Sequence, residues 1–196
     1  MPLSFHNDII LFTGKAKIRS MTYNDLHKIR PTEIDRNPFT LIDKDWFLLS
    51  AGSLNSFNTM TASWGGMGIL WNKPVVFCFV RPHRYTYGFM EKNEFFTMSF
   101  FDEAYRKALN LCGKVSGRDT DKMKASGLLP FVSPSGSVFY QQSNLMLECR
   151  KLYFNDIIPE HFLVSGIQSN YPKKDYHRMY IGEIVSCFAS SGRLAE

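Results

Sequence analysis

Cysteine and histidine are scarce in this sequence, and neither is spaced as a metal or disulfide framework requires. Cys78, Cys112, Cys149 and Cys187 stand far apart without a CxxC pair, and the five histidines form no HExxH or paired motif. These absences argue against a disulfide scaffold and predict that no metal is bound. Three of the thiols lie in apolar or alternating runs, which predicts buried structural cysteines, whereas Cys112 ends a helical pattern beside Gly113.

Long hydrophobic runs, internal repeats and strong linkers are also missing. No apolar run reaches the length of a membrane span, and residues 8–14 are too short and lack the basic start of a signal peptide. We therefore expect a cytoplasmic protein with no membrane partner. The 196 residues, 44% of them hydrophobic, suffice for one sizeable core, and 17 Phe and 9 Tyr favour strands over a helical bundle. A net charge of +5 can attract phosphates or acidic partners but does not by itself indicate nucleic acid.

A strand of small polar residues is predicted where the chain reads NTMTASW, before two glycines. Hydroxyl residues recur there with period two, so an extended chain places Thr59, Thr61 and Ser63 on one face. The other face carries Asn58, Met60, Ala62 and Trp64. Neither face is a good core face, which suits a strand whose backbone lies against a ligand. The alternative is an ordinary solvent-facing strand of an antiparallel sheet.

A buried strand, Val75–Val80, then leads into a basic turn reading RPHRYT. Thr86 is the natural N-cap of a helix that closes near Asn93. A helix start points free N–H groups at whatever precedes it, and Arg81 and Arg84 add forked donors that match phosphate oxygens. The turn therefore predicts a phosphate site, with a basic turn and capped helix without ligand as the alternative.

The rest of the chain predicts a mainly β order with short helices. Gly65-Gly66-Met67-Gly68 is interpreted as a turn or bulge, residues 116–119 as a cap for the next helix, and His177 as a packed histidine. Helices are expected at Tyr23–Ile29, Ala104–Leu111 and Asp119–Lys124, with a single turn at Pro159–Leu163. Strands are expected at Phe39–Ile42, Trp46–Ala51 and His177–Phe188, with Ser137–Gln141 and Leu145–Phe154 as two arms of one antiparallel pair. Loops are expected at Gly127–Gly136 and Gly166–Asp175.

Several blocks agree in order and spacing with one known family: NTMTASWGG, LWNKPVVFCFVRP, RYTYGFMEKNEFFTMSFF, CGKVSGRDTDK and DYHRMYIGEIV. Together they resemble the flavin reductase-like family, the FMN-binding split barrels that include flavoredoxin, over roughly residues 37–185. The resemblance implies an α+β fold, mainly β with short helices, built as a Greek-key antiparallel split β-barrel. It places a single domain at residues 21–196, after an extension at 1–20 that matches nothing.

The resemblance also implies where FMN binds. The strand from Asn58 to Trp64 would line the flavin ring and ribityl chain, and the basic turn would hold the phosphate. The later loop with Lys114 and Ser116 would approach the flavin or its phosphate. The implied cofactor-binding residues are Asn58, Thr59, Met60, Thr61, Ala62, Ser63, Trp64, Arg81, Arg84, Tyr85, Thr86, Lys114 and Ser116. No catalytic side chain is assigned, because FMN itself carries the electrons.

The sequence thus predicts an FMN-binding oxidoreductase of the flavin reductase or flavoredoxin type. Electrons would come from NADH, NADPH or a protein donor and pass to a small-molecule or protein acceptor, and the family resemblance implies a homodimer. A non-enzymatic FMN carrier or sensor is the main alternative. A nucleic-acid binder would need Lys and Arg interleaved with aromatics along several strands, whereas here the arginines gather at one turn, so no nucleic-acid partner is expected.

Overall fold

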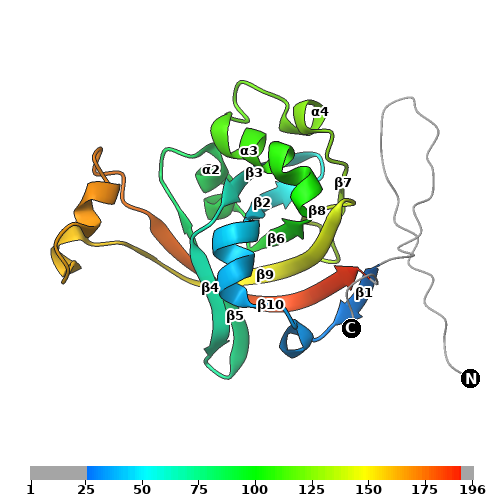
Figure 1. Ribbon diagram of the computed structural model, residues 1–196, viewed down its shortest axis with the longest axis horizontal. Helices are drawn as coiled ribbons and strands as arrows, with labels where there is room; N and C mark the ends of the chain where they lie inside the picture. The colour runs from blue at the N-terminus through cyan, green and yellow to red at the C-terminus, as the bar shows by residue number, and fades with distance from the viewer. Residues whose placement is uncertain (1–25, 191–196) are drawn as a thin grey trace, which may run out of the picture.

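A computed structural model describes residues 26–190, so the predicted extension at 1–20 lies outside the described residues. Its centre is an eight-stranded antiparallel sheet (Figure 1). The strands of this sheet are β1 (Leu26–Ile29), β2 (Phe47–Ser53), β3 (Ser56–Ala62), β4 (Gly65–Leu70), β5 (Lys73–Val80), β6 (Phe95–Phe101), β9 (Ser143–Asp156) and β10 (Arg178–Ser190).

The sheet curls but does not close. Its order is β3-β2-β6-β9-β10-β5-β4, with β1 paired to β10 beside this path, so β3 and β4 stand at its two ends. A second, two-stranded sheet joins β7 (Pro130–Val132) to β8 (Val138–Tyr140). The predicted mainly β split barrel with short helices is confirmed.

Strand β2 is buried on both faces because two cores meet on it. Phe47 and Leu49 enter the main core inside the curled sheet, where Phe96 and Tyr180 also lie. Leu48 points the other way, into a second core formed with side chains of α3 and of β8. Burial on both faces fits the three consecutive apolar residues Phe47, Leu48 and Leu49 at the start of β2, and the strand predicted at Trp46–Ala51 is confirmed.

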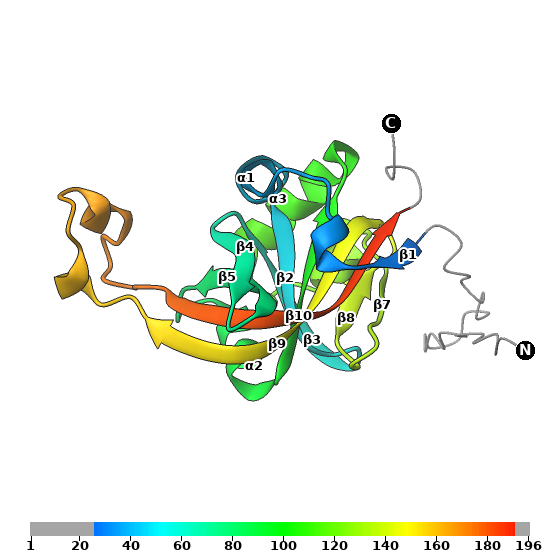
Figure 2. The ribbon, with the colours of Figure 1, turned by 90° about the horizontal axis from the view of Figure 1, so that it is seen from below.

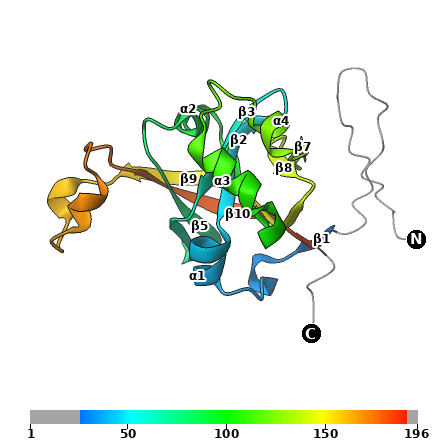
Figure 3. The same ribbon diagram turned by 45° about the horizontal axis from the view of Figure 1, so that its top comes forward.

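Short helices cover the sheet. The α-helices are α1 (Pro38–Thr40), α2 (Tyr85–Lys92), α3 (Arg106–Lys114) and α4 (Lys122–Ser126), with 3-10 turns at Pro31–Glu33, Glu103–Tyr105, Pro159–His161 and Ile167–Asn170 and a π-helical turn at Leu41–Asp45. Helix α3 packs across β3 and β2 with α4 beside it (Figure 3). Its amphipathic pattern was predicted, and so were the turn at Pro159 and strands β5 and β10.

A long arm projects from the barrel. Strands β9 and β10 run together beyond the rest of the sheet and are joined by residues 157–177, as Figures 1 and 2 show. This arm carries several exposed apolar side chains, among them Leu163 and Val164.

Two predictions near the start of the described chain were wrong. Phe39–Ile42 is helical, not a strand, because the Asn37 side chain accepts hydrogen bonds from the backbone of Phe39 and Thr40, and Pro38 occupies the first helical position. The described part of the helix predicted at Tyr23–Ile29 is strand β1, which pairs with the end of β10. A free strand edge thus overrides the local helical pattern.

The strand pairing predicted for Ser137–Gln141 and Leu145–Phe154 was also wrong. β8 pairs with β7, which lies inside the segment expected to be a loop at Gly127–Gly136. β9 has both of its edges occupied, by β6 on one side and β10 on the other. From Leu145 to Arg150, the part of β9 that is nearest to β8 in the chain, no edge is therefore left for β8.

The glycines after Trp64 form a strand instead of the predicted turn or bulge. Gly65 pairs with Cys78 in the β4–β5 ladder, and the reversal comes later, at Trp71 and Asn72 with φ of 51° and 57°. Positive φ at both central residues is the geometry of a type I′ hairpin turn.

The expected loop at Gly166–Asp175 holds one 3-10 turn. Helix α4 begins at Lys122, later than the predicted Asp119.

Candidate functional site

Two adjoining hollows lie between the edge strand β3, the turn that precedes α2 and the loop that follows α3. The larger, of about 410 Å³, is lined by Met60, Thr61, Ala62, Ser63, Trp64, Phe79, Arg81, His83, Arg84 and His177. The smaller, of about 120 Å³, is lined by Asn58, Met60, His83, Arg84, Tyr85, Thr86, Lys114, Val115, Ser116, Arg118 and Lys122. Shared walls at Met60, His83 and Arg84 make them parts of one cleft.

The structure brings together all of the predicted site residues except Thr59. The hydroxyl of Thr59 is buried behind the strand, where it contacts the Ser50 hydroxyl at 2.9 Å and the Leu49 carbonyl at 3.3 Å. Segments separated by more than fifty residues in the chain thus meet at one cleft. The separate predictions of a strand, a turn and a loop did not imply that these three segments lie together. Their roles toward a ligand remain predictions.

Strand β3 differs from its prediction in how its faces are used. We expected neither face to suit a core, yet Met60 and Ala62 belong to the main core. On the other face the Thr61 hydroxyl donates to the Leu109 carbonyl of α3. The strand is therefore held on both sides, and its unpaired edge borders the cleft because β3 pairs only with β2 among the described strands.

The two arginines of the turn have different partners. Arg81 forms an ion pair with Asp175 at 2.8 Å, donates to the Asn170 carbonyl at 2.9 Å and lies over the Tyr171 ring. Arg84 instead donates to the Gly113 carbonyl at 2.9 Å. Arg81 therefore ties the cleft to the arm, and Arg84 is the arginine that reaches the smaller hollow.

The N-cap of helix α2 lies two residues earlier than predicted. This N-cap is Arg84, and Thr86 is the second helical residue, whose hydroxyl accepts a 2.7 Å hydrogen bond from the Asn58 side chain. Among the described residues no side chain caps this helix, and Arg84, Tyr85 and Thr86 line the smaller hollow, so the positive end of the helix borders it. Thr86 joins the helix start to β3 instead of capping it.

Positive charge dominates the smaller hollow. Its ionisable lining side chains are His83, Arg84, Tyr85, Lys114, Arg118 and Lys122, and no Asp or Glu of residues 26–190 lines it. Burial lowers the pKa of Arg84, with a further contribution from Arg81, and burial lowers the pKa of Lys122 to about 8. A lowered pKa means that the protein interior disfavours these charges, so a bound anion would relieve the penalty.

Several lining residues were not predicted. Lys122 belongs to the quoted CGKVSGRDTDK block but was assigned only to a short helix, and Arg118 was assigned only to a cap. Arg118 lies over the Tyr85 ring, 4.7 Å from its centroid. The sequence pattern around Lys122 gave no signal for this position, because its side chain bonds to the backbone carbonyls of Thr59 in β3 and Cys112 in α3, which only the fold brings together.

His177 is packed, as predicted. It is buried, its Nδ1 lies 3.0 Å from the Tyr171 hydroxyl, and its ring is 5.1 Å from that of Trp64. Burial, aided by Arg81, lowers its pKa to about 4, so the imidazole is neutral near pH 7. The side chain gives the larger hollow a polar but uncharged wall.

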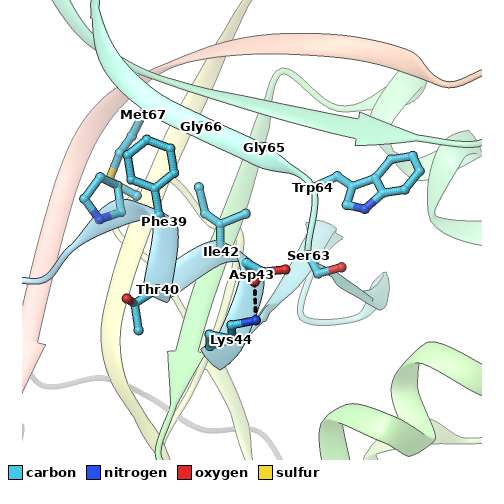
Figure 4. A pocket seen from close by; sticks show the side chains of 11 residues that line it. Phe39, Thr40, Ile42, Asp43, Lys44, Ser63, Trp64, Gly65, Gly66 and Met67 are labelled. Carbon is cyan, nitrogen blue, oxygen red and sulfur yellow. Dashed lines mark ion pairs between the residues drawn. The ribbon is translucent and has the colours of Figure 1, made fainter. Parts of the chain in front are cut away.

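A third hollow of about 590 Å³ shares Ser63 and Trp64 with the larger one (Figure 4). It lies between the α1 region and β4, and Figure 4 shows Phe39 beside Met67 at one end and the Asp43–Lys44 ion pair at 2.7 Å at another. Its lining is Pro38, Phe39, Thr40, Ile42, Asp43, Lys44, Ser63, Trp64, Gly65, Gly66 and Met67. An apolar group can rest there next to the cleft.

The cysteines, the possible metal ligands and the helix lengths bear on whether the chain offers what redox, metal and membrane sites need. The thiols of all four cysteines are free and buried, and burial raises the pKa of Cys112. Within residues 26–190, no three His, Cys, Asp or Glu side chains are grouped as a metal ion would need. None of the helices in that range is both long and apolar enough to span a membrane.

Known proteins share this architecture. The sequence matches the model of the flavin reductase like domain over residues 45–196, whereas no curated protein matches it. The structure is similar to an FMN-binding domain of a flavin reductases-like enzyme from Shewanella baltica, with a TM-score of 0.63 at 18% identity over 85% of this chain and 78% of that one.

Two further solved structures are similar. Flavoredoxin from Methanosarcina acetivorans has a TM-score of 0.61 at 22% identity, over 77% of this chain and 71% of that one. An FMN-binding protein from Thermus thermophilus, holding 1-cyclohex-2-enone, has a TM-score of 0.61 at 20% identity, over 91% of this chain and 84% of that one. At these identities the likeness establishes a common fold.

Proposed function

The chain belongs to the flavin reductase-like domain family, and from that premise we propose that it binds FMN and works as an oxidoreductase of the flavin reductase or flavoredoxin type. One observation carries the proposal: a small cation-lined hollow at the start of α2 opens into a larger hollow beside β3. A phosphate and a ring joined by a flexible chain need this combination. The names of the similar FMN-binding structures support it.

The side chains present fit the phosphate end of FMN. Arg84 and Lys114 supply positive charge, and the Thr86 and Ser116 hydroxyls supply further hydrogen-bonding groups. The uncapped start of α2 adds backbone donors and the positive end of a helix dipole. Because no carboxylate from the described part of the chain lines this hollow, an anion entering it meets no like charge from those residues.

The larger hollow fits a planar ring. Met60, Phe79 and Trp64 offer apolar and aromatic surface, and the unpaired edge of β3 offers backbone groups for the ring's polar edge. Arg81 and neutral His177 complete the wall. When bound, FMN would supply the hydride and electron chemistry, and the protein's part is to hold, orient and partly shield it.

We propose that a reduced nicotinamide, NADH or NADPH, or a protein donor reduces the bound flavin, and that a small molecule or protein accepts the electrons. The position of the third hollow favours a small apolar molecule as the acceptor, because this hollow adjoins the cleft at Ser63 and Trp64. Its Lys44 is paired with Asp43, so its walls carry little net charge.

Anaerobic spectroscopy tests the proposal. The purified protein, loaded with FMN and freed of excess, receives NADH and, in a separate sample, NADPH. Bleaching of the oxidised flavin band by either nicotinamide supports the proposal that the protein is an enzyme and identifies the electron donor. If FMN stays bound but neither nicotinamide nor a reduced electron-transfer protein bleaches it, the carrier or sensor alternative is correct. Failure to retain FMN at all overturns the proposal.

We also propose a homodimer in the cytoplasm. The arm exposes apolar side chains, with Leu163 97% and Val164 62% exposed, which is a costly surface for an isolated monomer. A second copy of the chain would cover them. The four free thiols suit a reducing compartment.

A further inference from the structure

Lys122 is a buried lysine at the base of the smaller hollow. It is the first residue of α4, and only 6% of its surface is exposed. Its ammonium nitrogen donates to the Thr59 carbonyl of β3 at 2.7 Å and to the Cys112 carbonyl of α3 at 2.9 Å. The side chain thus fastens the edge strand to the helix that packs on it.

This cation has no anionic partner in the described part of the chain. Among residues 26–190, no carboxylate oxygen lies within ion-pairing distance of the Lys122 nitrogen. An ammonium group has three donors, and two backbone carbonyls occupy two of them. A buried charge without a counter-ion is costly. Since Lys122 also lines the hollow, the remaining donor and the uncompensated charge can be satisfied from there.

The groups around Lys122 do not supply the missing negative charge. From α3, the Cys112 thiol is held neutral because burial raises its pKa. From the turn before α2, Arg84 adds a like charge. Lys114 and Arg118 border the same hollow from the loop, and His83 borders it from the turn. Burial, reinforced by Arg84, brings the pKa of Lys122 down to about 8.

We propose that Lys122 is a proton-linked phosphate anchor, so that the protein selects phosphorylated flavin only while this lysine carries its proton. This inference rests on the proposed function, because it concerns the phosphate end of the FMN site. It assigns Lys122 a specificity role beyond fastening β3 to α3.

Deprotonation separates the two roles of this side chain. A neutral amine still has two N–H donors, enough for the Thr59 and Cys112 carbonyls. It has lost the charge and the third donor that would meet the phosphate. Raising the pH should therefore weaken phosphate binding and leave the fastening in place.

The direction of the pH effect follows from linkage. A phosphate dianion beside Lys122 raises its pKa in the complex above the value of about 8 in the free protein. Between these two values, binding FMN takes up a proton, so FMN affinity falls as pH rises, approaching a tenfold loss per pH unit. Riboflavin lacks the phosphate and should show no such fall.

The experiment is a pair of titrations, with FMN and with riboflavin, at pH values from about 7 to about 9.5, where the phosphate stays dianionic. Ionisation of the shared ring cancels in the ratio of the two affinities. In the wild-type protein, this FMN preference should fall at least about tenfold across the range. In Lys122→Met it should be low and independent of pH. The matched control Lys124→Met, which removes an exposed lysine of the same helix, should behave as wild type.

The possible outcomes separate a failure of the Lys122 role from a failure of the proposed function. A wild-type preference that does not change with pH, or an unchanged pH dependence in Lys122→Met, overturns the role of Lys122 but leaves FMN binding intact. Failure of wild-type protein to bind either flavin at about pH 7 overturns the proposed function itself. If Lys122→Met does not fold, the wild-type titration still decides, together with proton uptake measured calorimetrically in two buffers of different ionisation enthalpy.

Discussion

The side-chain amide of Asn58 donates a 2.7 Å hydrogen bond to the hydroxyl of Thr86, and both groups are buried. This bond joins the edge strand β3 to the first turn of α2, the two elements that bound the smaller hollow. The bond therefore holds the helix start against the edge strand at the smaller hollow.

Thr86→Val should destabilise the protein without flavin present. The valine keeps the shape of the side chain but removes the acceptor, which leaves a buried amide of Asn58 unpaired. Such a loss costs about 1 to 3 kcal/mol in the free energy of unfolding, measurable by urea denaturation of the apoprotein. Thr86→Ser retains the hydroxyl and should lose less. Equal losses for the two variants would show that the hydrogen bond contributes little.

Arg84→Ala should weaken FMN binding roughly tenfold to a hundredfold, because a charge-assisted hydrogen bond to phosphate is lost. Riboflavin affinity should change far less. Removing the bond from Arg84 to the Gly113 carbonyl will also lower stability, so the thermal midpoint is measured in parallel. Arg30→Ala removes an equal charge from an exposed ion pair with Glu33 and serves as the control. Unchanged FMN affinity in Arg84→Ala would remove this residue from the phosphate site.

Gly117→Ala should disturb the loop that closes the smaller hollow. A Cβ at this position would lie 2.0 Å from the Asn58 side-chain oxygen, so the loop or Asn58 must move. Overpacking of this kind costs about 1 to 3 kcal/mol and should also lower FMN affinity. Gly68→Ala is the control, because a Cβ there meets nothing within 4 Å. Similar stability of the two variants would contradict the close packing of the loop against β3.

Protonation of His177 should destabilise the fold in acid. Its pKa of about 4 in the folded protein lies below the usual 6.5, so the unfolded chain binds the proton more tightly. The stabilisation is complete above about pH 6.5 and is lost as pH falls toward 4, by at most about 3 kcal/mol. Urea midpoints at several pH values measure this, and His177→Gln should flatten the profile. The exposed His161→Gln should leave the profile unchanged. An unchanged profile in His177→Gln would show that other groups dominate.

Leu163→Glu should weaken the proposed homodimer. The leucine is exposed on the arm, and a carboxylate there could not be covered by an apolar partner surface without a large desolvation penalty. Light scattering at micromolar concentration should report a dimer for the wild type and a lower mass for the variant. A monomeric wild-type protein would refute the dimer.

Much of the site was predictable because its signals are local. Alternation defines the strand from Asn58, and a basic turn beside a helix start indicates an anion site wherever it occurs. The order of the sequence blocks then indicated the split barrel. Local patterns also explain the error in the helix start. A threonine at position 86 looks like an N-cap in the sequence, whether or not its hydroxyl bonds to the distant Asn58.

Local patterns and the order of the sequence blocks were enough to predict the mainly β class, the strands β2, β5 and β10, and the segments that line the candidate site. Contacts between distant segments, which no local pattern records, pair Arg81 with Asp175, turn Arg84 to the smaller hollow and bury Lys122 without a counter-ion among residues 26–190. The fold also pairs β8 with β7. Strand edges, buried charges and carbonyl groups take partners from whichever distant segment the fold brings near. The residues next to them in the sequence do not show which segment that will be.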